Sequence, residues 1–184
     1  MYDVLIRNAT ILDGTGAPGC LGDIAVKDGV IAEIGTGLTG ANTVIDASGL
    51  TVSPGWIDSH SHSDSSVFSH PDQQEKVEQG ITFSITGQCG GSAAPKMEDE
   101  KLLTTQAFFE KATQTPQGSG SMMLVGHSNL RRLVMGTANR SATPEELAQM
   151  EQLLAESMEA GALGMSMGLI YVPSIYATTD ELIS

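Results

Sequence analysis

An apolar run that leads directly into a pair of histidines constrains the fold of this chain most strongly. Apolar residues at positions 50, 52, 56 and 57 precede His60-Ser61-His62, and Asp64 follows two residues later. Because side chains in an extended strand alternate between its two faces, His60, His62 and Asp64 are expected to point the same way. At ~3.3 Å of rise per residue, the two imidazoles lie close enough to bind one metal ion. A polar strand end in a surface loop would carry the same pattern, but the apolar residues before it favour a buried strand that ends at an active site.

The composition is that of a globular protein. Apolar residues make up 40% of the 184 residues and charged residues 17%, which excludes a disordered chain. No apolar segment approaches the ~20 residues that a transmembrane helix needs. The N-terminus lacks the basic and apolar regions of a secretory signal. We therefore expect a cytoplasmic protein that is long enough to bury a core.

Charge and cysteine usage limit the partners and the redox chemistry. Nine Lys and Arg residues against 22 Asp and Glu residues give a formal charge of −13. This excess of negative charge argues against nucleic acids and anionic membranes as partners. The two cysteines, Cys20 and Cys89, could pair, but without a secretion signal a metal-binding, catalytic or buried role is favoured over a disulfide.

Residues 1–52 have the pattern of a small antiparallel sheet. The apolar segment 4–12 predicts either a strand pair or one long bent strand. Segments 23–27 and 30–34 flank Asp28-Gly29, which is a strong hairpin signal because both turn positions favour positive φ. Two further short strands are expected at 43–46 and 50–52.

From residue 53 onward, predicted strands alternate with predicted helices, which indicates parallel β/α units. After the strand that carries the histidines, strands are expected at 81–86, 121–125 and 162–170. Helices are expected at about 72–79, 98–112 and 144–160, and another begins at 178. Thr143, Pro144 and Glu146 form the capping signature that starts the third helix.

The number of β/α units is half of that in a closed barrel. We count four units, whereas a (β/α)8 barrel has eight and about 250 residues. Either the chain is part of a longer enzyme or two copies complete each other, and the first alternative is favoured because the sequence stops within a predicted helix. Four strands leave two open sheet edges and exposed apolar side chains, so homo-oligomers through these edges are expected for the isolated chain.

Residues suited to catalysis or metal binding follow each of the predicted parallel strands. They are His60 and His62, then Cys89, then His127, and finally Tyr171. In β/α barrels the active site lies at these carboxyl ends of the strands. Cys89 sits among small residues in Gly87-Gln88-Cys89-Gly90-Gly91. As a thiolate it would be a strong zinc ligand, although a buried cysteine often serves only as a small apolar residue.

Four segments resemble known enzymes. Residues 54–64 (PGWIDSHSHSD) resemble the first barrel strand of the amidohydrolase superfamily, whose members are metal-dependent hydrolases on a (β/α)8 barrel. Residues 86–92 (TGQCGGS) resemble the glycine–cysteine–glycine turn of the N-acyl-D-amino-acid deacylases, or D-aminoacylases. Segments 125–131 and 161–174 are similar to the same group. The resemblance implies that residues 53–184 are the first half of the barrel and that residues 1–52 belong to a β-sandwich beside it.

The resemblance also implies roles for individual residues. Cys89 corresponds to the ligand of a tight zinc site, and His60 and His62 form a second, weaker metal position beside it. Tyr171 either lines the substrate cleft or packs over the carboxyl end of its strand. Four other residues are not expected to bind the metal. His127 is expected either to support the ligands or to stabilise its loop, and Asp64 is expected to support the site. Cys20 and His70 do not follow a predicted strand of the barrel, so both are expected to be structural. Gln88 replaces the asparagine that relatives often carry before the cysteine, which puts the substrate preference in question.

The implied reaction is hydrolysis of the amide bond of an N-acyl-D-amino acid, a small-molecule substrate. Zinc would polarise the acyl carbonyl and activate a water molecule, and a carboxylate would transfer the proton to the leaving amine. The resemblance places that carboxylate, the general base, beyond Ser184. Two alternatives stay open. The protein could be another amidohydrolase, such as a D-glutamyl or N-acyl hydrolase or a dipeptidase, or it could be a non-catalytic half-barrel that self-associates or binds a partner.

Overall fold

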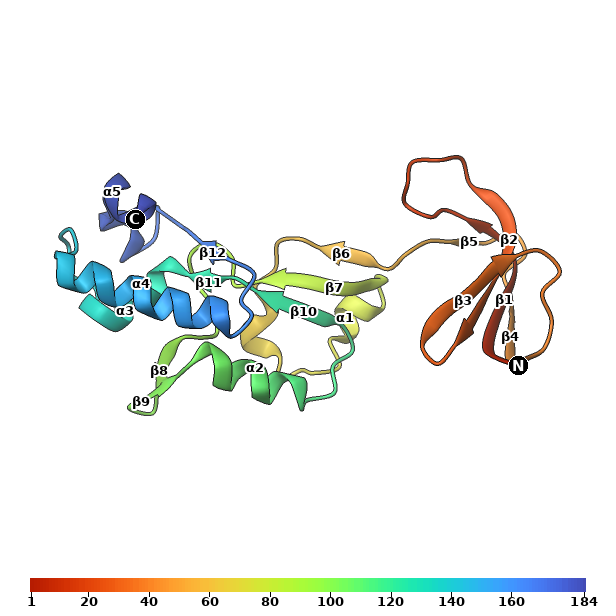
Figure 1. The fold of residues 1–184 in the computed structure, drawn as a ribbon, viewed down its shortest axis with the longest axis horizontal. Helices are drawn as coiled ribbons and strands as arrows, with labels where there is room; N and C mark the ends of the chain where they lie inside the picture. The colour runs from red at the N-terminus through yellow and green to blue at the C-terminus, as the bar shows by residue number, and fades with distance from the viewer. The chain divides into compact units, whose positions relative to one another are not determined.

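The computed structural model describes all 184 residues, which form two compact units. The first unit is Met1–Gly55 and the second unit is Trp56–Ser184 (Figure 1). The sequence predicts the change from strands alone to alternating strands and helices at residue 53, and the two units divide between residues 55 and 56. No helix in either unit has the length and apolar character needed to cross a bilayer.

The first unit is a single five-stranded sheet. Its strands are β1 (Tyr2–Ile11), β2 (Cys20–Lys27), β3 (Val30–Gly35), β4 (Ala41–Asp46) and β5 (Thr51–Val52). The strand order is β3-β2-β1-β4, and β5 pairs with the end of β1. A small core packs on it, formed by Ala9, Ile11, Ile24 and Ala47.

The predicted hairpin in the first unit is confirmed, but the prediction of a purely antiparallel sheet is wrong. β2 and β3 are antiparallel around Asp28 and Gly29, whose φ angles are 52° and 76°, as a two-residue turn of this kind requires. β4 and β5 instead run parallel to β1. The reason is that residues 36–40 carry the chain from the β3 edge of the sheet to the far side of β1, and such a crossover gives parallel pairing.

The first strand is one long strand with an irregularity near its middle. Its pairing with β2 shifts register between Ile6 and Ala9. Asn8 in this interval has a φ of 60°, and its backbone N–H donates to Asp23 Oδ1 over 2.9 Å. The structure therefore selects the long bent strand over the strand pair. The Asp23 carboxylate replaces a lost ladder bond, and hydrogen bonds from the Asn8 and Leu38 N–H groups lower the pKa of Asp23.

The second unit contains parallel strands joined by helices. β6 (Trp56–Asp58), β7 (Ile81–Thr86) and β10 (Gly120–Met123) form a parallel sheet in the order β10-β7-β6. β11 (Val125–Gly126) pairs in parallel with β12 (Met165–Ser166). The helices α1 (Gln74–Val77), α2 (Thr105–Thr113), α3 (His127–Met135) and α4 (Pro144–Glu159) connect these strands, and α5 (Thr179–Ile183) follows them (Figure 1). The predicted mixed α/β architecture is confirmed, and no closed barrel is formed.

The longest helix begins where the sequence predicts it. Thr143 is the N-cap of α4, and its side chain and that of Glu146 form both hydrogen bonds of a capping box. Arg140 donates two hydrogen bonds to Glu146, and with the Thr143 N–H this lowers the pKa of Glu146 to about 2. The buried face of α4 packs around Met150 in a core that also contains Val125, Leu130 and Ala162.

Two local predictions for the second unit are wrong, and one helix is not predicted. Residues 96–103 form a hairpin, β8 (Lys96–Glu98) and β9 (Lys101–Leu103), instead of a helix. Asp99 and Glu100 at its turn both have positive φ, and the helix α2 begins only after Thr104, whose side chain caps it. In the predicted strand 162–170, only Met165–Ser166 pairs. The segment 127–135, for which no helix is predicted, is the helix α3.

Apolar side chains are exposed along the edge of the second unit's sheet. Trp56 and Ile57 of β6 are 62% and 65% exposed, and Ile170, which lies outside this sheet, is 76% exposed. β6 also has no neighbour on its outer side. An edge of this kind offers free backbone groups and apolar surface to another polypeptide.

Candidate metal centre

His60 and His62 lie in a loop beyond the strand in which they are predicted. β6 ends at Asp58, and a short 3-10 helix begins at Ser63, so residues 59–62 (the histidine loop) form no ladder. The loop is held to the neighbouring strand because the Ser61 N–H donates to the Ile85 carbonyl over 3.0 Å. The prediction that strand alternation aligns His60, His62 and Asp64 is therefore wrong. The turn of the loop, and not a pleated strand, brings the two imidazoles together.

Cys89 lies in a tight turn just beyond β7. The turn comprises residues 87–91, and Cys89 itself has a φ of 56°, which is unusual for a residue with a side chain. Two glycines from other segments pack directly on its backbone. A Cβ atom at Gly168 would lie 2.0 Å from the Cys89 carbonyl oxygen, and one at Gly126 would lie 2.4 Å from the Gly90 carbonyl oxygen. This Cys89 turn is therefore fixed by close backbone packing that only glycine permits at these positions.

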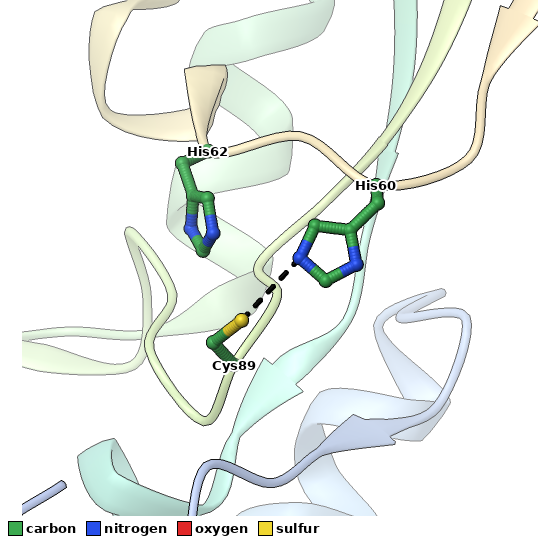
Figure 2. A group of neighbouring side chains, drawn as sticks. All are labelled: His60, His62 and Cys89. Atoms are coloured by element: carbon green, nitrogen blue, oxygen red, sulfur yellow. Dashed lines mark hydrogen bonds between the residues drawn. The ribbon is translucent and has the colours of Figure 1, made fainter.

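The histidine loop and the Cys89 turn meet in one cluster. The potential ligand atoms of His60, His62 and Cys89 all lie within 4.8 Å of one another. The Cys89 Sγ is 3.3 Å from His60 Nε2, and the two imidazole rings are 5.6 Å apart at an angle of 69°. Figure 2 shows both rings beside the sulfur atom. Asp64 does not join them, since it is buried and its Oδ2 accepts a hydrogen bond from the Ala93 N–H over 2.6 Å.

The donor atoms of this cluster suit zinc. Two imidazole nitrogens and one thiolate sulfur form a set that zinc binds in many proteins. A tetrahedral zinc ion holds sulfur at ~2.3 Å and nitrogen at ~2.1 Å, so two such ligand atoms lie about 3.6 Å apart. The 3.3 Å between Cys89 Sγ and His60 Nε2 is close to this value. Both histidines are exposed and Cys89 is half-buried, which leaves room for a water molecule or a substrate atom as a further ligand.

A cavity of about 460 Å³ opens beside the cluster. Its wall includes His62 and Cys89 together with Lys96, Arg132 and Tyr171. Asp64 is the only carboxylate in this wall. Gln88 also borders the cavity, but its amide donates to the Ser59 carbonyl over 3.0 Å, so it is directed toward the histidine loop.

The other residues singled out in the sequence lie apart from the cluster. His127 is the first residue of α3 and is buried, with Nδ1 2.8 Å from Ser174 Oγ and Nε2 3.2 Å from Glu181 Oε1. The His70 side chain is exposed and its imidazole hydrogen-bonds only with Ser69, and Cys20 is an exposed thiol at the start of β2. His127 thus ties α3 to the segment that contains α5.

Two residues that support the cluster are not apparent in the sequence. Ser166 of β12 donates to the Gly87 carbonyl over 2.5 Å and accepts from the Gly90 N–H over 3.0 Å, so one hydroxyl bridges the two sides of the Cys89 turn. Lys76 of α1 is buried beneath the histidine loop. Lys76 lies in a segment with no recognisable motif, and nothing in the recognised segment 161–174 singles out Ser166, so only the tertiary structure shows their contacts.

Replacement of Ser166 with alanine should destabilise the protein by about 1–3 kcal/mol, because it leaves the buried Gly90 N–H without a partner. Chemical denaturation measures this change. Alkylation of Cys89 should also become faster, since its turn loses both hydrogen bonds. The exposed Ser69 provides the control, and its alanine variant should behave like the wild type. Equal stability of Ser166→Ala and Ser69→Ala would contradict the bridging role of Ser166.

The buried His127 should make the protein less stable as the pH falls. Burial lowers the pKa of His127 from its usual value near 6.5, and this outweighs the opposing effect of Glu181. Below about pH 6.5, His127 therefore binds a proton in the unfolded chain but stays neutral in the folded protein. The free energy of unfolding falls as the pH decreases, until the pH reaches the lowered pKa of His127 in the folded protein. His127→Gln should show a smaller drop in melting temperature over this range. The control is His70→Gln, which replaces an exposed histidine and should show the full drop in melting temperature. Equal drops in the two variants would contradict the role of His127.

Comparisons with known proteins agree with the fold. The family model described as "Amidohydrolase family" matches residues 43–182. The N-acyl-D-aspartate deacylase of Alcaligenes xylosoxydans xylosoxydans is 41% identical over 98% of this chain and 39% of its own length. The N-acyl-D-glutamate deacylase of Bordetella bronchiseptica, solved with zinc and a phosphonate inhibitor that mimics the tetrahedral intermediate, aligns with a TM-score of 0.93 and 37% identity over 98% of this chain and 41% of its own.

A solved D-aminoacylase, described as having a binuclear metal centre, aligns with a TM-score of 0.92 and 34% identity over 100% of this chain and 42% of its own. The chain thus spans about two-fifths of the length of these relatives. The family model covers most of the chain, and the structural alignments extend over both units. This chain belongs to the amidohydrolase family.

Proposed function

We propose that this chain provides the metal-binding part of a zinc-dependent hydrolase that cleaves the amide bond of N-acyl-D-amino acids. The convergence of His60, His62 and Cys89, of which His62 and Cys89 line an open cavity, is the observation that carries the proposal. The similarity to deacylases of N-acyl-D-aspartate and N-acyl-D-glutamate supports the reaction type and the substrate class.

The proposed architecture is the first half of a (β/α)8 barrel over residues 53–184, with residues 1–52 as part of a β-sandwich. Two features support the half-barrel. The strands β6, β7 and β10 are parallel and adjacent in chain order, and the β11–β12 pair continues the parallel pattern. The cluster also lies beyond the carboxyl ends of β6 and β7, where β/α barrels place their active sites.

Cys89 is proposed to hold zinc in a tight site as a thiolate, with His60 and His62 completing a second, weaker position that shares the sulfur. The binuclear centre described for D-aminoacylase supports two positions. When bound, zinc polarises an acyl carbonyl and lowers the pKa of a coordinated water to ~7. The chain's own contribution is to present the two imidazoles and the sulfur at the correct spacing and to keep one side open.

The cavity wall is suited to a substrate with a carboxylate group. An N-acyl amino acid is an anion at neutral pH, and the wall carries Lys96 and Arg132, two of only nine basic residues in the chain. We propose that these cations attract the substrate carboxylate and that Tyr171 packs against the rest of the molecule. Asp64 is engaged with the Ala93 N–H. The carboxylate that transfers the proton to the leaving amine is therefore proposed to lie outside residues 1–184, in the length of the relatives that this chain does not span.

A chimeric enzyme tests the reaction and the substrate class. Residues 1–184 replace the corresponding segment of the Alcaligenes N-acyl-D-aspartate deacylase, and release of free amine is measured with D and L forms of N-acyl amino acids. We expect hydrolysis of the D forms, its loss in the Cys89→Ser chimera, and its retention in the Cys20→Ser chimera. A folded, zinc-loaded chimera that releases no amine would contradict the deacylase proposal, and equal hydrolysis of L forms would favour another amidohydrolase.

The exposed sheet edge supports one further proposal, self-association of the isolated 184-residue chain. Trp56, Ile57 and Ile170 expose apolar surface, and β6 has a free edge. Light scattering should therefore detect homo-oligomers whose fraction decreases in the Ile57→Ser variant. A wild-type chain that stays monomeric at high concentration would contradict self-association and leave the metal site unaffected.

A further inference from the structure

A buried lysine lies directly beneath the histidine loop. Lys76 of α1 is only 7% exposed, and its ammonium group is surrounded by serine hydroxyls. Its Nζ donates to Ser61 Oγ over 2.8 Å, to Ser63 Oγ over 2.8 Å and to Ser84 Oγ over 2.6 Å. A lysine ammonium has three N–H donors. All three donors are therefore used, and each is bonded to a different serine.

The charge of this lysine is also balanced. Asp58 Oδ2, at the end of β6, is 3.7 Å from Lys76 Nζ. A buried ammonium without partners is strongly unfavourable, whereas one with complete hydrogen bonding and a counter-charge is tolerated. The site thus holds a charged lysine stably in place, close to the metal cluster and without contact to its ligand atoms.

Two of the three serines belong to the segment that carries the histidines. Ser61 lies between His60 and His62, and Ser63 follows His62. The Ser61 and Ser63 hydroxyls are also 3.1 Å from each other, so both side chains converge on one nitrogen. Ser61 is buried, whereas His60 and His62 are exposed. The hydroxyls of the serines are therefore turned toward the buried Lys76, whereas the two histidines are exposed to solvent.

Lys76 orients the side chains of the histidine loop, as backbone pairing would do if β6 were longer. β6 ends at Asp58, so no ladder fixes the direction of the side chains at residues 60–62. The Ser61 N–H bond to Ile85 is the only hydrogen bond between backbone groups found for these residues, and the His60 N–H donates to the Asp58 carboxylate over 3.2 Å. The third serine, Ser84, lies on β7, which leads into the Cys89 turn. Lys76 thus connects the loop of the two imidazoles to the strand that carries the sulfur.

We propose that Lys76 is a positioning residue that sets the metal affinity of the His60–His62 pair. By holding Ser61 and Ser63 inward, it keeps the two imidazoles turned toward Cys89 without touching the metal. The inference rests on the proposed metal site and extends it to a residue outside the ligand set. Residues that orient metal ligands in this way typically change metal affinity by 10–100-fold when they are replaced.

The test is the zinc affinity of the 184-residue chain, measured by competition with a chromogenic chelator. Lys76→Met keeps the length of the side chain and removes its donors. We expect zinc binding to weaken about 10–100-fold in this variant while circular dichroism shows a folded protein. Lys101→Met is the matched control, because Lys101 is exposed on β9 and its replacement removes the same charge as Lys76→Met. The control should bind zinc like the wild type.

Serine variants separate positioning from stability and serve as well if Lys76→Met fails to fold. Ser61→Ala removes an acceptor in the histidine loop and Ser63→Ala removes one directly after it, and these two are called the loop variants. Ser84→Ala removes an acceptor on β7. Positioning predicts weaker zinc binding in the two loop variants than in Ser84→Ala, even where melting temperatures are equal. With cobalt(II) in place of zinc, the Cys89 charge-transfer band should persist in the loop variants while the ligand-field bands change.

Failure of the positioning role and failure of the metal site would give different results. A folded Lys76→Met protein with wild-type zinc affinity, or equal zinc affinity in all three serine variants, would overturn the positioning role and leave the metal site intact. A wild-type chain that binds no zinc would overturn the metal site, and the positioning role with it.

Discussion

Replacement of Cys89 with serine should reduce the zinc content of the purified protein from about one equivalent per chain to below about a tenth. The physical reason is the loss of the only sulfur donor in the cluster, at the position where Sγ lies 3.3 Å from His60 Nε2. A serine hydroxyl is not deprotonated near neutral pH and is a poor zinc ligand, and two exposed imidazoles alone bind zinc weakly. Elemental mass spectrometry of the dialysed protein measures the change.

The matched control removes the other thiol. Cys20 is exposed at the start of β2, and Cys20→Ser should keep the zinc content of the wild type. Equal zinc in the Cys89→Ser and wild-type proteins would show that the metal is held elsewhere. A parallel loss in Cys20→Ser would point to adventitious binding by free thiols.

Replacement of Arg131 with methionine should destabilise the protein by about 3–5 kcal/mol, the largest change in stability that we expect. Arg131 is fully buried in α3, and its guanidinium donates to both carboxylate oxygens of Glu181 in α5. Its Nη2 also donates to the Arg140 carbonyl over 2.8 Å. The substitution therefore leaves a buried carboxylate without its counter-charge, which costs far more than the loss of a surface pair. Urea denaturation followed by circular dichroism measures the free energy of unfolding.

An exposed arginine–glutamate pair provides the control. Arg140 also binds a glutamate, Glu146, but its side chain is 49% exposed, so Arg140→Met should change the free energy of unfolding by no more than about 1 kcal/mol. The double variant Arg131→Met/Glu181→Gln should recover part of the loss, because it removes the buried charge together with its partner. A loss in Arg131→Met no greater than that in Arg140→Met would contradict the proposed importance of burial.

Local signals in the sequence predict the local structure well. The Asp28-Gly29 turn and the capping box at Thr143 and Glu146 depend on residues that are neighbours in the sequence, and the structure confirms both. β7 also matches its predicted bounds at 81–86, because turn residues flank a short apolar run. These features depend on local backbone preferences that tertiary contacts do not override.

Features that depend on distant segments could not be predicted. The parallel pairing of β4 with β1 depends on where the chain crosses the sheet, which no local pattern encodes. The helix expected at 98–112 rests on roughly helical spacing from Leu102 to Lys111, but the positive φ values at Asp99 and Glu100 turn its first part into a hairpin. The helix α3 was missed because its buried face contains His127, Asn129 and Arg131, polar residues whose partners lie in other segments.

The sequence identified the residues of the candidate metal centre but not the way in which they meet. The spacing of His60 and His62 and the glycine-flanked Cys89 pointed to metal ligands, and their ligand atoms do lie together. Strand alternation was the wrong mechanism, since the chain leaves the strand at Asp58. The contacts that fix the cluster join residues far apart in sequence, such as Ser166 with the Cys89 turn and Lys76 with the histidine loop.

X-ray absorption spectroscopy at the zinc edge tests most directly whether this chain holds a metal through the cluster. The protein is loaded with one equivalent of zinc, and the distances of the coordinating atoms are measured. The cluster predicts one sulfur at ~2.3 Å together with imidazole nitrogens at ~2.0–2.1 Å. A first coordination sphere that contains only oxygen and nitrogen atoms, with no sulfur, would contradict the assignment of His60, His62 and Cys89 as the metal centre.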